Sequence, residues 1–206
     1  MKRSKTLAAA AMATLPGWAG PSEAHIVGAR LGDFYAGALH PLTDLQDIVL
    51  WIAVGLLAGS LGSAQGRWLV LVIPAGLLAG LTVALFFGVS FVGTLASAVM
   101  MVTIGLLIAS GMRLRSISLC VIAFGLAAMR GVANAGDVLP ETNRVLFAAG
   151  LIAAGYSAIT LIMALTVAFR GADAKGASSW RNIAIRVCGS WIAAIGLMIG
   201  GLALAS

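Results

Sequence analysis

The sequence predicts an all-α membrane protein, a bundle of six transmembrane helices that follows a cleaved N-terminal signal peptide. Of its 206 residues, 61% are hydrophobic and 10% are charged, and the mean hydropathy is +1.04. Because soluble domains are only about half apolar, this composition excludes a soluble globular protein. The lengths of the apolar stretches and the placement of the basic residues between them predict the number and direction of the helices.

The N-terminal segment, residues 1–24, has the features of a secretory signal peptide. A basic start precedes an apolar run from Leu7 to Leu15, and Ser22-Glu23-Ala24 is a small-x-small cleavage site. The run is too short to cross a bilayer. The alternative, an uncleaved membrane anchor, is weakened because Pro16, Gly17, Gly20 and Pro21 break any helix there. We therefore expect residues 25–206 to form one integral membrane domain that starts with His25 outside the cytoplasm.

Six later stretches are long and apolar enough to cross a membrane. About 20 helical residues are needed to span the roughly 30 Å of hydrocarbon. The predicted spans are Leu45–Leu61, Trp68–Gly88, Phe91–Met112, Ile117–Ala135, Val145–Phe169 and Ile183–Leu204.

Basic residues are concentrated in alternate loops, which predicts the orientation. Cytoplasmic loops collect Lys and Arg. The loops assigned to the cytoplasm contain Arg67, Arg113, Arg115, Arg170, Lys175 and Arg181. Both ends of the mature chain are therefore expected outside, in a multi-pass protein of the bacterial inner membrane. The net charge of +6 reflects this orientation and does not indicate a nucleic-acid partner.

Small residues recur four positions apart in five of the six predicted spans. Examples are Gly55 with Gly59 and Gly76 with Gly80. Small residues at this spacing share one helix face and let membrane helices approach closely. They favour a tightly packed bundle.

Polar side chains are rare in the chain, and the first cluster of them lies around the start of the first span. His40, Asp44 and Asp47 occur in the stretch HPLTDLQD. Ionisable groups in membrane helices are costly, so a functional role is the first hypothesis. Pro41 favours a turn or a first helical position. Because residues four apart share a helix face, we expect the three side chains to converge. Helix capping by Asp44 is the simpler alternative.

A second cluster lies at the end of the fourth span, which the orientation also places on the outer side. It contains Arg130, Asn134 and Asp137. A buried arginine either extends to the surface or pairs with an acid. Asp47 is the natural partner for Arg130, with Asp44 and Asp137 behind it.

These two clusters resemble the HupE/UreJ family of small nickel or cobalt permeases, which is associated with hydrogenase and urease maturation. The family motifs read roughly His-Pro-x-x-Gly-x-Asp-His in the first span and His-Gly-x-Ala-His-Gly-x-Glu in the fourth. Four positions match: His40, Pro41, Gly131 and Ala133. Differences from the family include Asp44 for Gly, Gln46 for Asp, Asp47 for His, Arg130 and Asn134 for the two His, and Asp137 for Glu.

The resemblance implies a permease whose substrate is Ni²⁺ or Co²⁺ and which holds no resident cofactor. Its outer metal site would consist of His25, His40, Asp44 and Asp47. Imidazole suits these metals, and this chain has Asp47, Arg130 and Asn134 where the family motifs have histidine. No phosphate-binding loop is present in the sequence, so transport would need an ion gradient, a downhill flux or a partner.

Two alternatives remain open. In the first, an Arg130–Asp47 ion pair replaces the metal site, and the protein is a structural or assembly subunit of a membrane complex. In the second, His25 binds Cu²⁺ through its amine and ring nitrogen, although a disordered terminus is the plainer explanation. The expected partners are the lipid bilayer and either further copies of the chain or other membrane subunits. An enzyme is not indicated, because the sequence has no nucleophile set or haem-attachment motif.

Overall fold

The computed structural model describes residues 32–89, 94–112, 114–136, 138–171 and 180–205, so the predicted signal peptide and His25 lie outside the described residues. In these ranges the chain forms seven helices and no strand, which confirms the all-α fold. The helices are α3 (Asp33–Thr43), α4 (Leu45–Leu61), α5 (Ser63–Phe87), α6 (Thr94–Ser110), α7 (Ser116–Ala135), α8 (Arg144–Arg170) and α9 (Trp180–Ala205).

Several of these helices are long and apolar enough to cross a membrane. Four of them, α5, α7, α8 and α9, meet this criterion alone. The helices α3 and α4 meet it together, although they are bent by 82° relative to each other. Helix α6 is apolar but has only 17 residues. The structure thus supports a multi-pass membrane protein, and the number of six spans stays a prediction.

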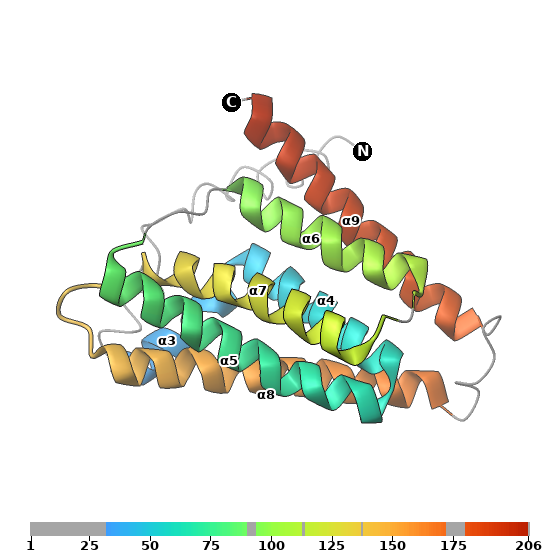
Figure 1. Cartoon of the computed structure of the whole chain (residues 1–206), viewed down its shortest axis with the longest axis horizontal. Helices are drawn as coiled ribbons and strands as arrows, with labels where there is room; N and C mark the ends of the chain where they lie inside the picture. The colour runs from blue at the N-terminus through green and yellow to red at the C-terminus, as the bar shows by residue number, and fades with distance from the viewer. Residues whose placement is uncertain (1–31, 90–93, 113, 137, 172–179, 206) are drawn as a thin grey trace, which may run out of the picture.

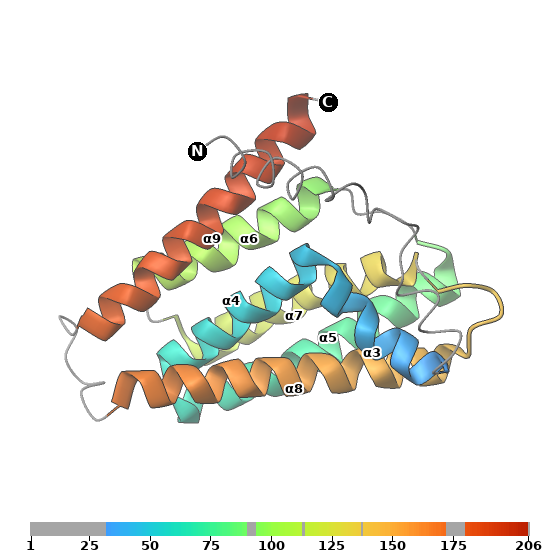
Figure 2. The same cartoon turned by 180° about the vertical axis from the view of Figure 1, so that it is seen from behind.

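The bend between α3 and α4 corrects the sequence analysis, which placed no helix before Leu45. Pro41 was expected in a turn or at a first helical position, but it lies in the last turn of α3. There its ring removes one backbone hydrogen bond, and the helix ends two residues later. Asp44 then adopts an extended conformation (φ −91°, ψ 112°) before α4 begins. The chain therefore changes direction inside the polar cluster (Figure 2).

Close helix pairs form where small residues face a neighbouring helix. α5 packs along α7, α6 along α9, and α8 along both α3 and α4 (Figure 1). A Cβ atom on Gly55 would lie 2.5 Å from Ile162 Cβ, and one on Gly76 would lie 2.7 Å from Ala127 Cβ. Only glycine permits these approaches, which confirms the predicted role of the small residues.

The α6–α9 pair is inclined to the other helices and packs on them chiefly through α4 (Figures 1 and 2). A buried apolar core continues across this boundary and includes Leu50 and Leu57 of α4 together with Met100 and Ile104 of α6. The boundary between α4 and α6 is also where the polar cluster and an apolar space lie.

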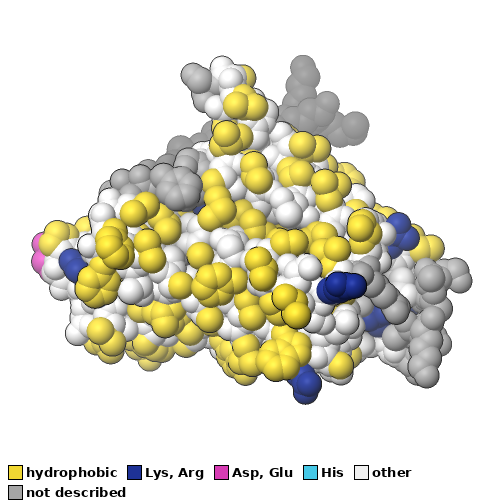
Figure 3. Space-filling view, in the orientation of Figure 1, with side chains coloured by type: hydrophobic (Ala, Val, Ile, Leu, Met, Phe, Trp, Pro, Cys, Tyr) yellow, Lys and Arg dark blue, Asp and Glu magenta, His cyan; other side chains and the backbone are white. Residues whose placement is uncertain are grey.

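Arginine and tryptophan side chains mark one end of the molecule. Arg67 lies over the Trp68 ring at 5.5 Å, and Arg181 lies over the Trp180 ring at 5.7 Å. Such pairs are typical of a membrane–water interface. On the face shown in Figure 3, most Lys and Arg side chains lie toward this end, where α5 and α9 begin. It is the end that the loop charges assign to the cytoplasm.

Candidate functional site

The site begins at Asp44, in the break between α3 and α4. Its Oδ1 atom accepts a hydrogen bond of 2.8 Å from the backbone N–H of Gln46, which caps α4. Its Oδ2 atom accepts a hydrogen bond of 3.0 Å from Nη2 of Arg130. The two oxygen atoms thus have different roles, because one satisfies a helix end and the other receives a charge-assisted bond.

Asp47 lies one turn further on and is almost completely buried, with 1% of its surface exposed. Nε of Arg130 donates to its Oδ1 atom at 2.7 Å, and Nη2 lies 2.6 Å from the same oxygen. The Oδ2 atom is also buried, and it has no hydrogen-bond partner among the described residues. One oxygen of this carboxylate therefore makes two contacts with Arg130, and the other oxygen makes no hydrogen bond among the described residues.

Arg130 joins three helices through one guanidinium group. From α7 it binds the two carboxylates at the start of α4, and its Nη1 atom donates a hydrogen bond of 2.9 Å to Ser97 Oγ on α6. Asn134, also buried, donates from Nδ2 to the backbone oxygen of Arg130 at 2.9 Å and so stays within its own helix. Sequence reasoning missed Ser97, because a lone serine in an apolar helix gives no signal of a partner.

His40 lies in the last turn of α3, where its ring centroid is 6.2 Å from that of Phe147. His40 lies on α3 and Asp47 on α4, so the single helix face on which their convergence was predicted is absent, although the two side chains still interact electrostatically. No group of three His, Cys, Asp or Glu side chains that could hold a metal ion occurs among the described residues. His25 was predicted as a metal ligand and Asp137 as a member of the polar cluster at the end of the fourth span, and both lie outside the described residues.

With every group ionised, the cluster of Asp44, Asp47 and Arg130 carries a net charge of −1, from two carboxylates and one guanidinium. This charge favours a cation over an anion. A cation that bound both carboxylates would, however, have to take the place of Arg130, because like charges repel strongly in a site shielded from water. In the structure, both carboxylates are thus paired with Arg130, a cation that belongs to the protein itself.

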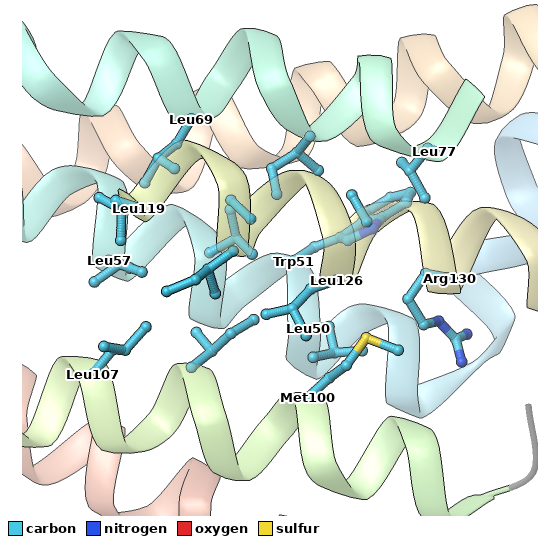
Figure 4. A pocket seen from close by; sticks show the side chains of 16 residues that line it. Leu50, Trp51, Leu57, Leu69, Leu77, Met100, Leu107, Leu119, Leu126 and Arg130 are labelled. Carbon is cyan, nitrogen blue, oxygen red and sulfur yellow. The ribbon is translucent and has the colours of Figure 1, made fainter. Parts of the chain in front are cut away.

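An apolar space of about 40 Å³ extends from Arg130 toward the opposite end of the molecule (Figure 4). Trp51, Leu77 and Met100 are among its lining side chains, and Leu57 and Leu107 lie at the end remote from Arg130. A space of this size admits at most a few water molecules, and apolar cavities usually stay dry.

Comparison with known protein families decides the identity of the chain. The family described as HupE / UreJ protein matches residues 11–199, which is most of its length. The chain belongs to the HupE/UreJ family. This confirms the resemblance drawn from the two motifs, and the bend between α3 and α4, with the buried Asp47 beside it, is therefore a structural feature of a HupE/UreJ protein. Searches of curated proteins and of solved structures found no match.

Proposed function

We propose that this HupE/UreJ protein is an inner-membrane permease for a divalent transition metal ion, Ni²⁺ or Co²⁺, with Asp44 and Asp47 as the outer recognition site. The observation that carries the proposal is the burial of Asp47 within an apolar helix, with one carboxylate oxygen that has no partner among the described residues. Burying such a group in a membrane helix is costly, so a functional role is the default hypothesis, and an ion pathway is one such role.

The proposal includes a specific sequence of events. Arg130 balances one carboxylate while the site is without metal, and an entering dication would displace it from Oδ1 of Asp47 and Oδ2 of Asp44. His40, at the end of α3, would contribute a nitrogen ligand, as would His25, since imidazole suits nickel and cobalt. The absence of a phosphate-binding loop from the sequence means that an ion gradient, a downhill flux or a partner subunit drives transport.

Metal uptake by cells under limiting metal tests this function. Cells that contain the protein should accumulate more radioactive nickel or cobalt than cells without it, and Asp47→Asn should abolish the difference. Asp33→Asn is the matched control, because Asp33 lies on α3 and accepts from the backbone N–H of Asn143 at 2.8 Å, away from Arg130. Uptake that is equal with and without the native protein would overturn the proposal.

A second candidate function follows from the contacts of Arg130. Its bonds to α4 and α6 would stabilise the bundle without any metal, as expected of a structural or assembly subunit in which an ion pair replaces the metal ligands. Under this alternative, Asp47→Arg combined with Arg130→Asp should recover much of the stability lost in each single variant. A double variant no more stable than either single one would count against it.

Calorimetry with nickel separates the two candidates. The comparison uses the native protein and a variant that restores the histidines of the family motifs, Asp47→His with Arg130→His and Asn134→His. Binding by the native protein that is lost in His40→Ala favours the permease. Binding by the restored variant alone favours the structural subunit.

A further inference from the structure

Asp47, the central residue of the proposed metal site, is 1% exposed, so an ion reaches its carboxylate only if neighbouring groups move. The packing of the described helices indicates which element moves. Helices α3, α4, α5, α7 and α8 form one group, and the α6–α9 pair lies against this group chiefly through α4. The pair is the candidate, because it is joined to the other five helices less closely than they are joined to one another.

The glycines show this division most directly. Within the pair, a Cβ atom on Gly105 would lie 2.5 Å from the backbone nitrogen of Ala193, and one on Gly196 would lie 2.8 Å from Met101 Cβ. For every glycine within the described helices that has neighbours at such a Cβ position, the nearest neighbours belong to its own group of helices. Close approach is what holds membrane helices together. Each group is therefore tightly packed, and the boundary between them is not.

The boundary is also incompletely filled. The apolar space of about 40 Å³ is lined by Met100 and Ile104 of α6 on one side and by residues of α4, α5 and α7, such as Leu50 and Trp51, on the other (Figure 4). Side chains beside an unfilled space lack part of the dispersion attraction that a packed contact gives. A tilt of the α6–α9 pair against α4 therefore disrupts fewer contacts than a similar movement within either group.

At the end that the loop charges assign to the cytoplasm, polar contacts join the start of α9 to the end of α8. Nε of Arg170 donates to Asn182 Oδ1 at 3.0 Å, and Nη1 of Arg181 donates to the backbone oxygen of Arg170 at 3.3 Å. From there α9 diverges from α8 toward its C-terminus (Figures 1 and 2). This end is thus the natural pivot, and a tilt displaces the opposite end of the pair most.

At that opposite, outer end, one guanidinium group holds α6 against the other helices. Nη1 of Arg130 donates to Ser97 Oγ at 2.9 Å, in the first turn of α6. Nε of the same group donates to Asp47 Oδ1, and Nη2 donates to Asp44 Oδ2. The group that an entering dication would displace is therefore also the group that fastens α6.

We propose that the α6–α9 pair is a mobile unit that pivots at its cytoplasmic end, and that the hydrogen bond from Arg130 to Ser97 is the latch that keeps it closed. The coupling of this movement to metal rests on the proposed permease function. Brief opening admits the ion, and the ion bound to Asp44 and Asp47 repels the guanidinium group. Because the carboxylates bind the ion better once Arg130 has withdrawn from them and from Ser97, the ion stabilises the open arrangement.

The reaction rate of a buried thiol tests the latch without any metal. Met100→Cys places a thiol at the boundary with α4, and Met101→Cys is the matched control, because Met101 is equally buried but faces α9 within the pair. Cys120→Ala and Cys188→Ala remove the two native thiols. A water-soluble maleimide is added to the full chain in detergent micelles. When reclosing is faster than modification, the reaction rate follows the population of the open arrangement.

Removal of the latch should raise that population. Ser97→Ala leaves Nη1 of Arg130 without its acceptor only in the closed arrangement, so the rate at Met100→Cys should rise about tenfold, as expected for one charge-assisted hydrogen bond. The rate at Met101→Cys should not change. Ser190→Ala, which removes an exposed hydroxyl group that bonds within α9, should leave both rates unchanged. An unchanged rate at Met100→Cys, or an equal rise at Met101→Cys that indicates general unfolding, would overturn the latch.

Calorimetry with nickel tests the coupling to metal, in protein that retains its native methionines. An affinity that is limited by the fraction of open molecules increases with that fraction. Ser97→Ala should therefore bind nickel about tenfold more tightly than the native protein, whereas a purely structural role of Ser97 predicts equal or weaker binding, which would overturn the coupling. Absence of nickel binding by both proteins would count against the permease, and the thiol experiment would still decide the latch.

Discussion

Arg130 on α7 donates a hydrogen bond of 2.9 Å to the hydroxyl group of Ser97 on α6, and the Nε atom of the same guanidinium donates to Asp47 on α4. The hydroxyl group thus connects the inclined α6–α9 pair to the carboxylate cluster. Ser97 is 1% exposed, so water does not substitute for it. The cluster is a junction of three helices as well as a group of charges.

Removal of this hydroxyl should weaken the attachment of the α6–α9 pair. Ser97→Ala leaves a buried donor of Arg130 without its acceptor, and we expect a loss of about 1–3 kcal/mol in the free energy of unfolding. Ser190→Ala on α9 is the control, because that hydroxyl bonds within its own helix and is exposed. Thermal unfolding in detergent micelles measures both variants. Equal stability of the two would contradict the role of Ser97.

The two carboxylates should differ in their effect on stability. Asp47→Asn removes the charge that Arg130 faces in a buried pair, for which a loss of about 3–5 kcal/mol is expected. Asp44→Asn should cost much less, because 36% of the Asp44 side chain is exposed and asparagine caps a helix as well as aspartate does. Chemical unfolding of both variants in micelles provides the comparison. A larger loss for Asp44→Asn would contradict this expectation, because it would mean that the pair of Arg130 with the partly exposed Asp44 contributes more than the pair with the buried Asp47.

Two glycines of α7 form a matched pair for testing helix packing. A Cβ atom on Gly131 would meet the backbone oxygen of Leu77 on α5, whereas one on Gly125 would meet nothing within 4 Å. Gly131→Ala is therefore expected to destabilise the protein by about 1–3 kcal/mol through overpacking. Gly125→Ala should be neutral or stabilising by up to about 1 kcal/mol. Melting temperatures that shift equally would contradict the close approach of α5 and α7.

Reporter fusions can test the predicted orientation and the number of spans. A periplasmic reporter such as alkaline phosphatase should be active when it follows Ser206 and inactive when it follows Gly62, between α4 and α5. The mass of the purified protein should correspond to a chain that begins at His25. An inactive reporter after Ser206 together with an active one after Gly62 would reverse the orientation.

The sequence predicted the long helices well and the break between α3 and α4 poorly. Hydropathy depends on composition, so the predicted span Leu45–Leu61 coincides with α4. The helix before it was missed because a proline followed by polar residues usually marks a turn, whereas here Pro41 sits in a last helical turn. The 82° bend could not be predicted, since the contacts of α3 with α8 arise only in the folded bundle.

The contacts of the candidate site were likewise predicted only in part. Asp47 and Arg130 were paired on charge alone, since few ionised groups lie at that depth, and the structure brings them together. The contact of Ser97 with Arg130 required three-dimensional information, because the two residues come from different helices and a serine has many ordinary roles.

The position of Arg130 has a consequence for affinity. Because the guanidinium is attached to the same chain as Asp44 and Asp47, it acts as a tethered competitor whose effective concentration at the carboxylates is set by the geometry of α7 and not by the surrounding solution. Any external cation must out-compete it, so the measured affinity is the intrinsic affinity reduced by that internal competition. Weak binding by the native protein would then report how readily Arg130 leaves, and a shorter or neutral side chain at position 130 would reveal how strongly the carboxylates hold an ion.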